Sequence, residues 1–197
     1  MSQGICYVAL GNKAVSEAKK SYATLPKDYE VEVFGKGGEK SELTTEQQAH
    51  LAKTNVFDWS PFDQTLLLDA DTRVKGDLSI GFDLLNRGAE LVIVPSQPPR
   101  PEQVLWNLSP AEKEYTFSEL GNYAHVMLNT GVMFFRKTPN VEVLFKEWTQ
   151  EWFRFKDRDQ GALLRALHSR PVISRLLGPA FNSADGEVVQ HLFGRAR

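Results

Sequence analysis

The chain of 197 residues contains almost no cysteine. Cys6 is the only one, so a disulfide within the chain is excluded. Because Cys6 belongs to the apolar run 5–10, we expect it to be a small core residue rather than a nucleophile. A chain without disulfides suits a reducing compartment, and we expect a cytoplasmic protein.

Long apolar runs are also missing. No segment approaches the roughly 20 apolar residues that a helix needs to cross a bilayer. The N-terminus lacks the basic flank and apolar stretch that are typical of a secretory signal. We therefore expect neither a transmembrane segment nor export by such a signal.

The charges show no excess of one sign. The net charge is -2, and no block of lysine and arginine resembles those that neutralise a nucleic-acid backbone. Nucleic acid is therefore not the expected partner. No internal repeat or low-complexity tract is visible, and the length suits one domain spanning residues 1–197.

The chain does contain a regular alternation of short apolar runs and helix-forming segments. Strands are expected at 5–10, 30–34, 64–68, 90–94 and 130–136, and helices at 13–24, 44–53, 141–155 and 159–167. Thr44 or Thr45 with a glutamine three residues on predicts a capping box. The order of these elements predicts an α/β sandwich with a largely parallel sheet.

Two further segments carry expectations about packing. One face of the helix 141–155 carries an aromatic stripe that we expect to be buried against the sheet, made of Leu144, Trp148, Trp152 and Phe155. Residues 96–115 contain four prolines, and we expect a loop there with at most one helical turn. Trp106 indicates that this loop folds onto the rest of the molecule.

Asp69 and Asp71 directly follow the apolar run 66–68, which we expect to end a buried strand. Ligands of open α/β sheets bind outside the carboxyl ends of the strands. Hard oxygen ligands suit Mg²⁺ or Mn²⁺, so the pair predicts a divalent metal site, although both carboxylates could instead cap backbone N–H groups. Asp157 and Asp159 repeat the spacing in a charged stretch, where we expect no second metal site.

Several motifs together resemble the retaining GT-A glycosyltransferases of the glycogenin and lipopolysaccharide galactosyltransferase family. In chain order they are Lys53, the segments 62–72 and 128–132, Asp159-Gln160, Phe181-Asn182 and the segment 191–197. The spacing is part of the likeness, since a lysine stands sixteen residues before Asp69 and a basic residue six after His191. The resemblance implies a single-domain GT-A fold, an α/β/α sandwich with a mostly parallel mixed sheet.

The resemblance also implies a reaction, the transfer of a hexose from a nucleotide-diphosphate donor, a UDP-sugar, with retention. It assigns a Mn²⁺ (or Mg²⁺) ion to Asp69, Asp71 and His191. The donor-binding residues that it implies are Ala9, Leu10, Gly11, Asn12, Lys53, Asp69, Ala70, Asp71, Gly194 and Arg197. Lys53 and Arg197 would stabilise the charge of the leaving diphosphate.

The chain departs from the family's pattern at two of these positions. Arg197 stands where the family usually has lysine, and Gly11-Asn12 stands where it often has an acidic or aromatic residue.

Three catalytic positions follow from the same resemblance. Asn129, Asp159 and Gln160 match residues that line the donor sugar, and we assign Asp159 and Gln160 to positioning and to stabilising the oxocarbenium ion.

Simpler interpretations exist for several of the site residues when each is taken alone. Asp159 could be a helix N-cap, Lys53 a solvated lysine at a helix end and His191 an ordinary core or surface histidine.

Two competing functions are also compatible with the sequence. A haloacid-dehalogenase-type phosphatase also places Asp-x-Asp after a strand, but Arg73 stands where that family wants threonine or valine. A non-catalytic GT-A-like domain would bind a nucleotide-sugar without transferring it. The acceptor is open as well, with a glycan, a lipid-linked sugar, a protein side chain and modified DNA as alternatives. The prolines of 95–110 would form a rigid surface loop or frame that acceptor.

Overall fold

The computed structural model describes residues 1–35, 42–97, 105–121 and 125–196. Its strands are β1 (Gln3–Val8), β2 (Glu30–Phe34), β3 (Gln64–Asp69), β4 (Thr72–Val74), β5 (Leu91–Pro95), β6 (Leu128–Arg136), β7 (Ser174–Leu176) and β8 (Val189–His191). Its helices are α1 (Asn12–Tyr22), α2 (Thr45–Thr54), α3 (Val56–Trp59), α4 (Ser79–Asn86), α5 (Pro110–Leu120), α6 (Pro139–Phe155), α7 (Asp159–Ser169) and the 3₁₀ turn η1 (Pro179–Phe181). The expected strands and helices all recur, with ends within two residues of those expected.

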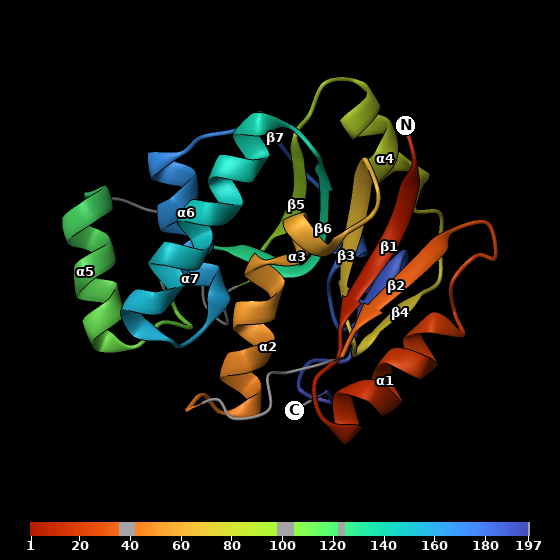
Figure 1. Cartoon of the computed structure of the whole chain (residues 1–197), viewed down its shortest axis with the longest axis horizontal. Coiled ribbons are helices and arrows are strands. Elements are labelled where there is room, and N and C mark those ends of the chain that lie inside the picture. Colours follow the sequence, from red (N-terminus) through yellow and green to blue (C-terminus); the bar gives the residue numbers. More distant parts are fainter. Residues whose placement is uncertain (36–41, 98–104, 122–124, 197) are drawn as a thin grey trace.

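Six strands form a central sheet in the order β2-β1-β3-β6-β5-β7 (Figure 1). β1 pairs in parallel with β2 and β3, and β5 pairs in parallel with β7, whereas β6 is antiparallel to both of its neighbours. β4 and β8 form a separate antiparallel pair. The expected α/β sandwich with a mostly parallel mixed sheet is confirmed.

Alternate residues of the central strands enter two apolar cores, one on each face of the sheet. In β3, Leu67 packs with α2, α3, α6 and α7, whereas Leu66 and Leu68 pack with α4 and η1. This alternation follows from the two-residue period of a strand. α5 lies on the outer side of α6 and α7 (Figure 1).

The packing expectations are confirmed except for Phe155. Leu144, Trp148 and Trp152 are almost fully buried in the core. Phe155 is half-buried and packs against Tyr115 of α5 rather than against the sheet, with ring centroids 5.5 Å apart. Cys6 is fully buried, and this burial raises the pKa of its thiol to about 12. Thr44 and Gln47 form the expected capping box at the start of α2. None of the described helices is long and apolar enough to cross a membrane.

Two local expectations were wrong, and one simpler interpretation of a site residue does not hold. The loop expected over 96–115 contains the start of α5, because Ser109 accepts a hydrogen bond from the backbone N–H of Glu112 and a proline fits the first turn of a helix. Pro98, Pro99 and Pro101 lie outside the described residues. Asn129 lies within β6 rather than before it, and Arg158 rather than Asp159 occupies the N-cap of α7.

Candidate functional site

A cleft of about 1220 Å³ opens at the sheet edge where β1 and β3 end. It is lined by most of the residues that the sequence predicted for a site, namely Leu10, Gly11, Asn12, Lys53, Asp69, Ala70, Asp71, Asn129, Asp159, Gln160, His191 and Gly194. Ala9 lies behind the wall, fully buried against Ala14, Ala18 and Ala70. Arg197 lies outside the described residues.

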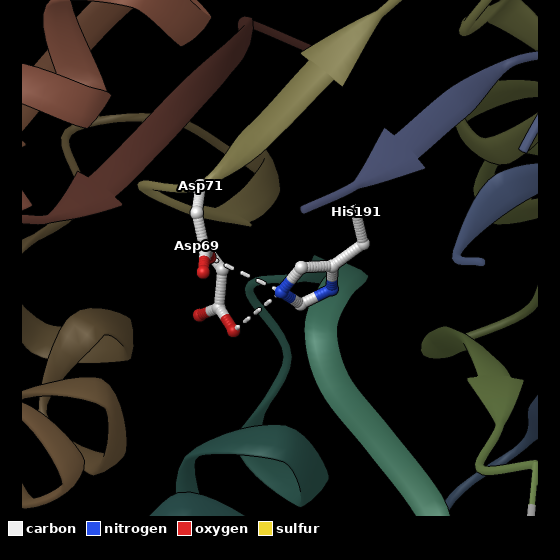
Figure 2. Close-up of side chains that lie close together, drawn as sticks. All are labelled: Asp69, Asp71 and His191. Atoms are coloured by element: carbon white, nitrogen blue, oxygen red, sulfur yellow. Dashed lines mark hydrogen bonds and ion pairs between the residues drawn. The ribbon is translucent and has the colours of Figure 1, made fainter. Parts of the chain in front are cut away.

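Asp69, Asp71 and His191 converge in this cleft (Figure 2). Asp69 ends β3, and the pairing of β4 with β8 sets Thr72 opposite His191. The imidazole Nε2 lies 3.1 Å from Asp71 Oδ1 and 3.7 Å from Asp69 Oδ2. In the part of the chain that the structure describes, no other group of three such side chains is spaced to hold a metal ion.

The spacing of these three ligand atoms suits a divalent cation. All lie within 4.8 Å of one another. Around an octahedral ion with ligands at about 2.1 Å, neighbouring ligand atoms are about 3 Å apart and opposite ones about 4.2 Å. Two carboxylate oxygens and one imidazole nitrogen could therefore hold such an ion after small adjustments.

Further groups orient these ligands. His191 Nδ1 lies 2.7 Å from Asn182 Oδ1, so this nitrogen carries a proton and Nε2 faces the carboxylates. Asp71 Oδ2 accepts hydrogen bonds from the backbone N–H groups of Arg195 and Ala196. Burial alone would raise the pKa of Asp71, but the contact with His191 and the backbone N–H of Ala196 hold that pKa below its ordinary value.

Gly131 on β6 lets the ligands approach the sheet. A Cβ at this position would lie 2.5 Å from His191 Cε1 and 2.8 Å from Asp69 Oδ2. Only a residue without a side chain leaves room for both groups. The sequence motif contained this glycine, but its steric role depends on a histidine far along the chain.

Lys53 bridges two carboxylates beside the metal-ligand group. Its ammonium group is ion-paired with Asp69 Oδ1 and lies 3.4 Å from Asp159 Oδ2. Burial opposes the charged form, yet these two carboxylates raise the pKa of Lys53 above its ordinary value. Lys53 is buried, so the interpretation as a solvated lysine was wrong.

Several groups hold the buried carboxylate of Asp159 in place. Thr130 donates a hydrogen bond of 2.9 Å to its Oδ2, and His50 Nδ1 lies 3.4 Å from its Oδ1. Burial alone would raise the pKa of Asp159, but Lys53 and His50 lower it well below its ordinary value. Asp159 is therefore an ionised carboxylate at the cleft wall.

Sequence reasoning assigned no role in the site to four residues of the cleft. His50 lies one turn before Lys53 on α2, and that spacing is the signal that could have identified it. Asn182 was noted only as part of a motif. Trp106 lines the cleft, and the Asn107 side-chain amide donates a hydrogen bond to Gln160 Oε1. These contacts depend on the approach of distant elements.

The two remaining predicted side chains are held in different ways. Asn129 is buried, and its Oδ1 accepts a hydrogen bond of 3.0 Å from the backbone N–H of Gly131. The Gln160 side chain is half-buried. Carboxylates outnumber cationic side chains among the described residues of the cleft, so an anionic ligand would bind better with a metal ion.

No protein-family model matches the chain, and no curated protein matches it.

Solved glycosyltransferase structures are similar to the chain in fold. Mouse xyloside xylosyltransferase 1, in its apo form, has a TM-score of 0.62 at 11% identity, covering 100% of this chain and 99% of that one. A glycosyltransferase involved in glycosylation of the major capsid of PBCV-1 has a TM-score of 0.64 at 13% identity, covering 100% and 96%. Galactosyltransferase LgtC, in complex with donor and acceptor sugar analogues, has a TM-score of 0.60 at 14% identity, covering 97% and 87%.

These similarities show that the chain has the GT-A glycosyltransferase fold, as the sequence predicted. Membership of the glycogenin and lipopolysaccharide galactosyltransferase family stays a prediction.

Proposed function

We propose that the protein is a glycosyltransferase that moves a hexose from a UDP-sugar to an acceptor with retention of configuration. The observation that carries this proposal is the group of Asp69, Asp71 and His191 at the carboxyl edge of a GT-A sheet. The LgtC structure, which holds donor and acceptor sugar analogues, supports it by analogy of fold. A cytoplasmic location and a single domain are part of the same proposal.

In this proposal Asp69, Asp71 and His191 bind Mn²⁺. The imidazole nitrogen favours Mn²⁺ over Mg²⁺, which prefers an all-oxygen shell. The bound ion supplies Lewis-acid stabilisation of charge on the leaving diphosphate.

The other lining residues bind the donor. Leu10, Gly11 and Asn12 would contact the nucleobase and ribose, with Ala9 shaping the wall behind them. Ala70 and Gly194 would approach the diphosphate through their backbones, and Arg197 would add a positive charge.

Lys53 acts beside the reacting bond. Its charge is maintained by Asp69 and Asp159, so it is already oriented when negative charge develops on the diphosphate. Asp159, Gln160 and Asn129 would position the donor sugar, and the ionised Asp159 would stabilise positive charge at the anomeric carbon. A phosphatase of the haloacid-dehalogenase type is not proposed, because the fold is GT-A.

The first test is thermal unfolding with Mn²⁺ and UDP, added singly and together. A ligand at one hundred times its Kd stabilises the folded state by about 2.7 kcal/mol, so both together should raise Tm by several degrees. Asp69→Asn should lose the shift, whereas Asp157→Asn, at the exposed first aspartate of the second Asp-x-Asp, should keep it. No shift with any nucleoside diphosphate would contradict the proposal.

The second test separates an enzyme from a binding domain. A panel of UDP- and GDP-sugars, incubated with Mn²⁺, identifies the donor by its slow hydrolysis without any need for the acceptor. Binding of UDP without hydrolysis or transfer of any of these sugars would instead favour a non-catalytic nucleotide-sugar-binding domain.

A further inference from the structure

Trp106 lines the cleft from a turn at residues 105–107. Its side chain is 38% exposed and lines the cleft wall. An indole is a large apolar surface, and leaving it this exposed forgoes the stabilisation that burial would provide. Trp59 is even more exposed, so what distinguishes Trp106 is that its exposed indole lines the cleft.

The turn that carries Trp106 is anchored on both sides. Leu105 has a positive φ of 54°, and Leu108 donates its backbone N–H to the Leu105 carbonyl oxygen at 3.1 Å. Both leucines are buried with Met127, against Phe117 and Leu164. A leucine keeps such a strained backbone only where its surroundings over-determine it, and strain of this kind gathers at functional sites. The packing thus holds Trp106 at the cleft wall.

The residue next to Trp106 contacts the start of α7, whereas the proposed nucleobase contacts Leu10 to Asn12 follow β1. The parallel strands β1, β3 and β5 end at the same edge, and β5 lies three strand positions from β1. That separation is about 14 Å. Asn107, the next residue, contacts Gln160 at the start of α7, beside Asp159. Trp106 therefore belongs to the part of the cleft wall where Asn107 meets Gln160, next to Asp159.

We propose that Trp106 is a stacking platform for the acceptor and that this acceptor is a carbohydrate. The inference rests on the proposed function and adds the substrate class. A sugar ring combines an apolar C–H face with hydroxyl groups around its edge. The indole face can pack on the C–H face, and the side-chain amides of Asn107 and Gln160 can form hydrogen bonds with the hydroxyl groups.

The proposed transfer forms one bond and breaks another. An acceptor hydroxyl oxygen bonds to the anomeric carbon of the donor. The bond from that carbon to the diphosphate oxygen breaks, and its electron pair leaves with UDP. The hydroxyl proton ends on the released diphosphate.

Phe193 is a second exposed aromatic residue of the cleft, but its position differs. Its ring stacks on the imidazole of His191, with centroids 4.0 Å apart. One face of Phe193 is therefore used at the metal-ligand group, and we assign the platform to Trp106 alone.

Saturation-transfer NMR with free sugars tests the platform directly. The probes are the methyl glycosides of glucose, galactose, mannose and xylose, together with lactose and maltose, each titrated with and without UDP and Mn²⁺. Wild type should bind at least one of them, and Trp106→Ala should bind it about tenfold more weakly, as loss of one ring contact implies. Trp106→Phe should recover part of the affinity.

Trp59→Ala is the matched control. Trp59 belongs to α3, is similarly exposed at 46% and packs beside Phe34 of β2. It does not belong to the lining of the cleft. It should bind sugars as wild type does. The affinity for UDP with Mn²⁺ should be the same in wild type, Trp106→Ala and Trp59→Ala.

Three outcomes would overturn the platform. Failure of wild type to bind any sugar of the panel would exclude the carbohydrate acceptor, and equal binding by wild type and Trp106→Ala would exclude a role for the ring. Loss of UDP affinity in Trp106→Ala, with sugar binding intact, would assign the indole to the nucleobase. Failure of UDP and Mn²⁺ to bind wild type would count against the proposed function instead, because free sugars test the platform without nucleotide.

Discussion

Asn182 Oδ1 lies 2.7 Å from Nδ1 of His191, and this contact determines which imidazole nitrogen faces Asp69 and Asp71. Because an amide oxygen only accepts, Nδ1 must carry a proton. Nε2 then either holds a second proton, which it donates to Asp71, or offers its lone pair to a metal ion. A cation and a proton therefore compete for one position.

Asn182→Ala should weaken Mn²⁺ binding by about 10- to 100-fold, the usual effect of removing a group that orients a metal ligand. Asn182→Asp should keep most of the affinity, because a carboxylate also accepts from Nδ1. Titration of Mn²⁺, followed by the electron paramagnetic resonance of the free ion, measures the Mn²⁺ affinity of both variants. Asn140→Ala on α6, where Asn140 contacts Glu90, is the control. Wild-type affinity in Asn182→Ala would exclude the orienting role.

Gly131→Ala should disrupt the site and the fold together. The new methyl group would collide with His191 and Asp69, and overpacking of this kind costs about 1–3 kcal/mol of unfolding free energy. Urea denaturation and Mn²⁺ titration on the same protein check both effects. Gly178→Ala is the matched control, since no atom lies within 4 Å of a Cβ there. Equal results for the two variants would contradict the steric role of Gly131.

Local signals in the sequence accounted for much of the fold. The alternation at 30–34 and the capping box at Thr44 each depend on neighbouring residues, and both match the structure. α5 was missed because proline usually interrupts a helix, whereas Pro110 occupies the first helical position, where no N–H is needed.

The site could be predicted only in part, for a similar reason. Asp69 and Asp71 follow a recognisable strand, so local pattern was enough to suggest a metal pair. His191 reaches them through the pairing of β4 with β8, and only the resemblance to a family pointed to it. The spacing of His50 to Lys53 on α2 was available in the sequence, but its contact with Asp159 depends on the packing of α2 against α7. Trp106 reaches the cleft through a strained turn, which no short spacing encodes.

His50→Ala should lower kcat for donor hydrolysis about tenfold with little change in KM. His50 Nδ1 is the group that faces Asp159 Oδ1, and loss of one charge-assisted contact is worth about that factor. His50→Gln offers an amide donor and should recover most of the rate. His168→Ala, at an exposed position near the end of α7, is the control. Equal losses in the alanine and glutamine variants would show that the contact with Asp159 is not what matters.

Glu90→Gln should destabilise the fold at neutral pH and matter less in acid. Oε1 of Glu90 accepts hydrogen bonds from Thr138 and Asn140, and Oε2 accepts from the backbone N–H of Ile173. Glutamine would turn an N–H group toward one of these donors, at a cost of about 2 kcal/mol. Although burial opposes ionisation, the three donors hold the pKa of Glu90 below its ordinary value.

The pH dependence of this variant follows from that lowered pKa. A carboxyl group whose pKa is lower in the folded state stabilises the protein above its unfolded pKa, and this stabilisation is lost as pH falls through the folded pKa. The difference in unfolding free energy between wild type and Glu90→Gln should therefore be full at pH 7 and shrink below pH of about 4. Urea denaturation across this range measures it, with Glu119→Gln on the exposed face of α5 as control. A difference that is constant with pH would mean that the ionised carboxylate contributes nothing to the stability of the fold.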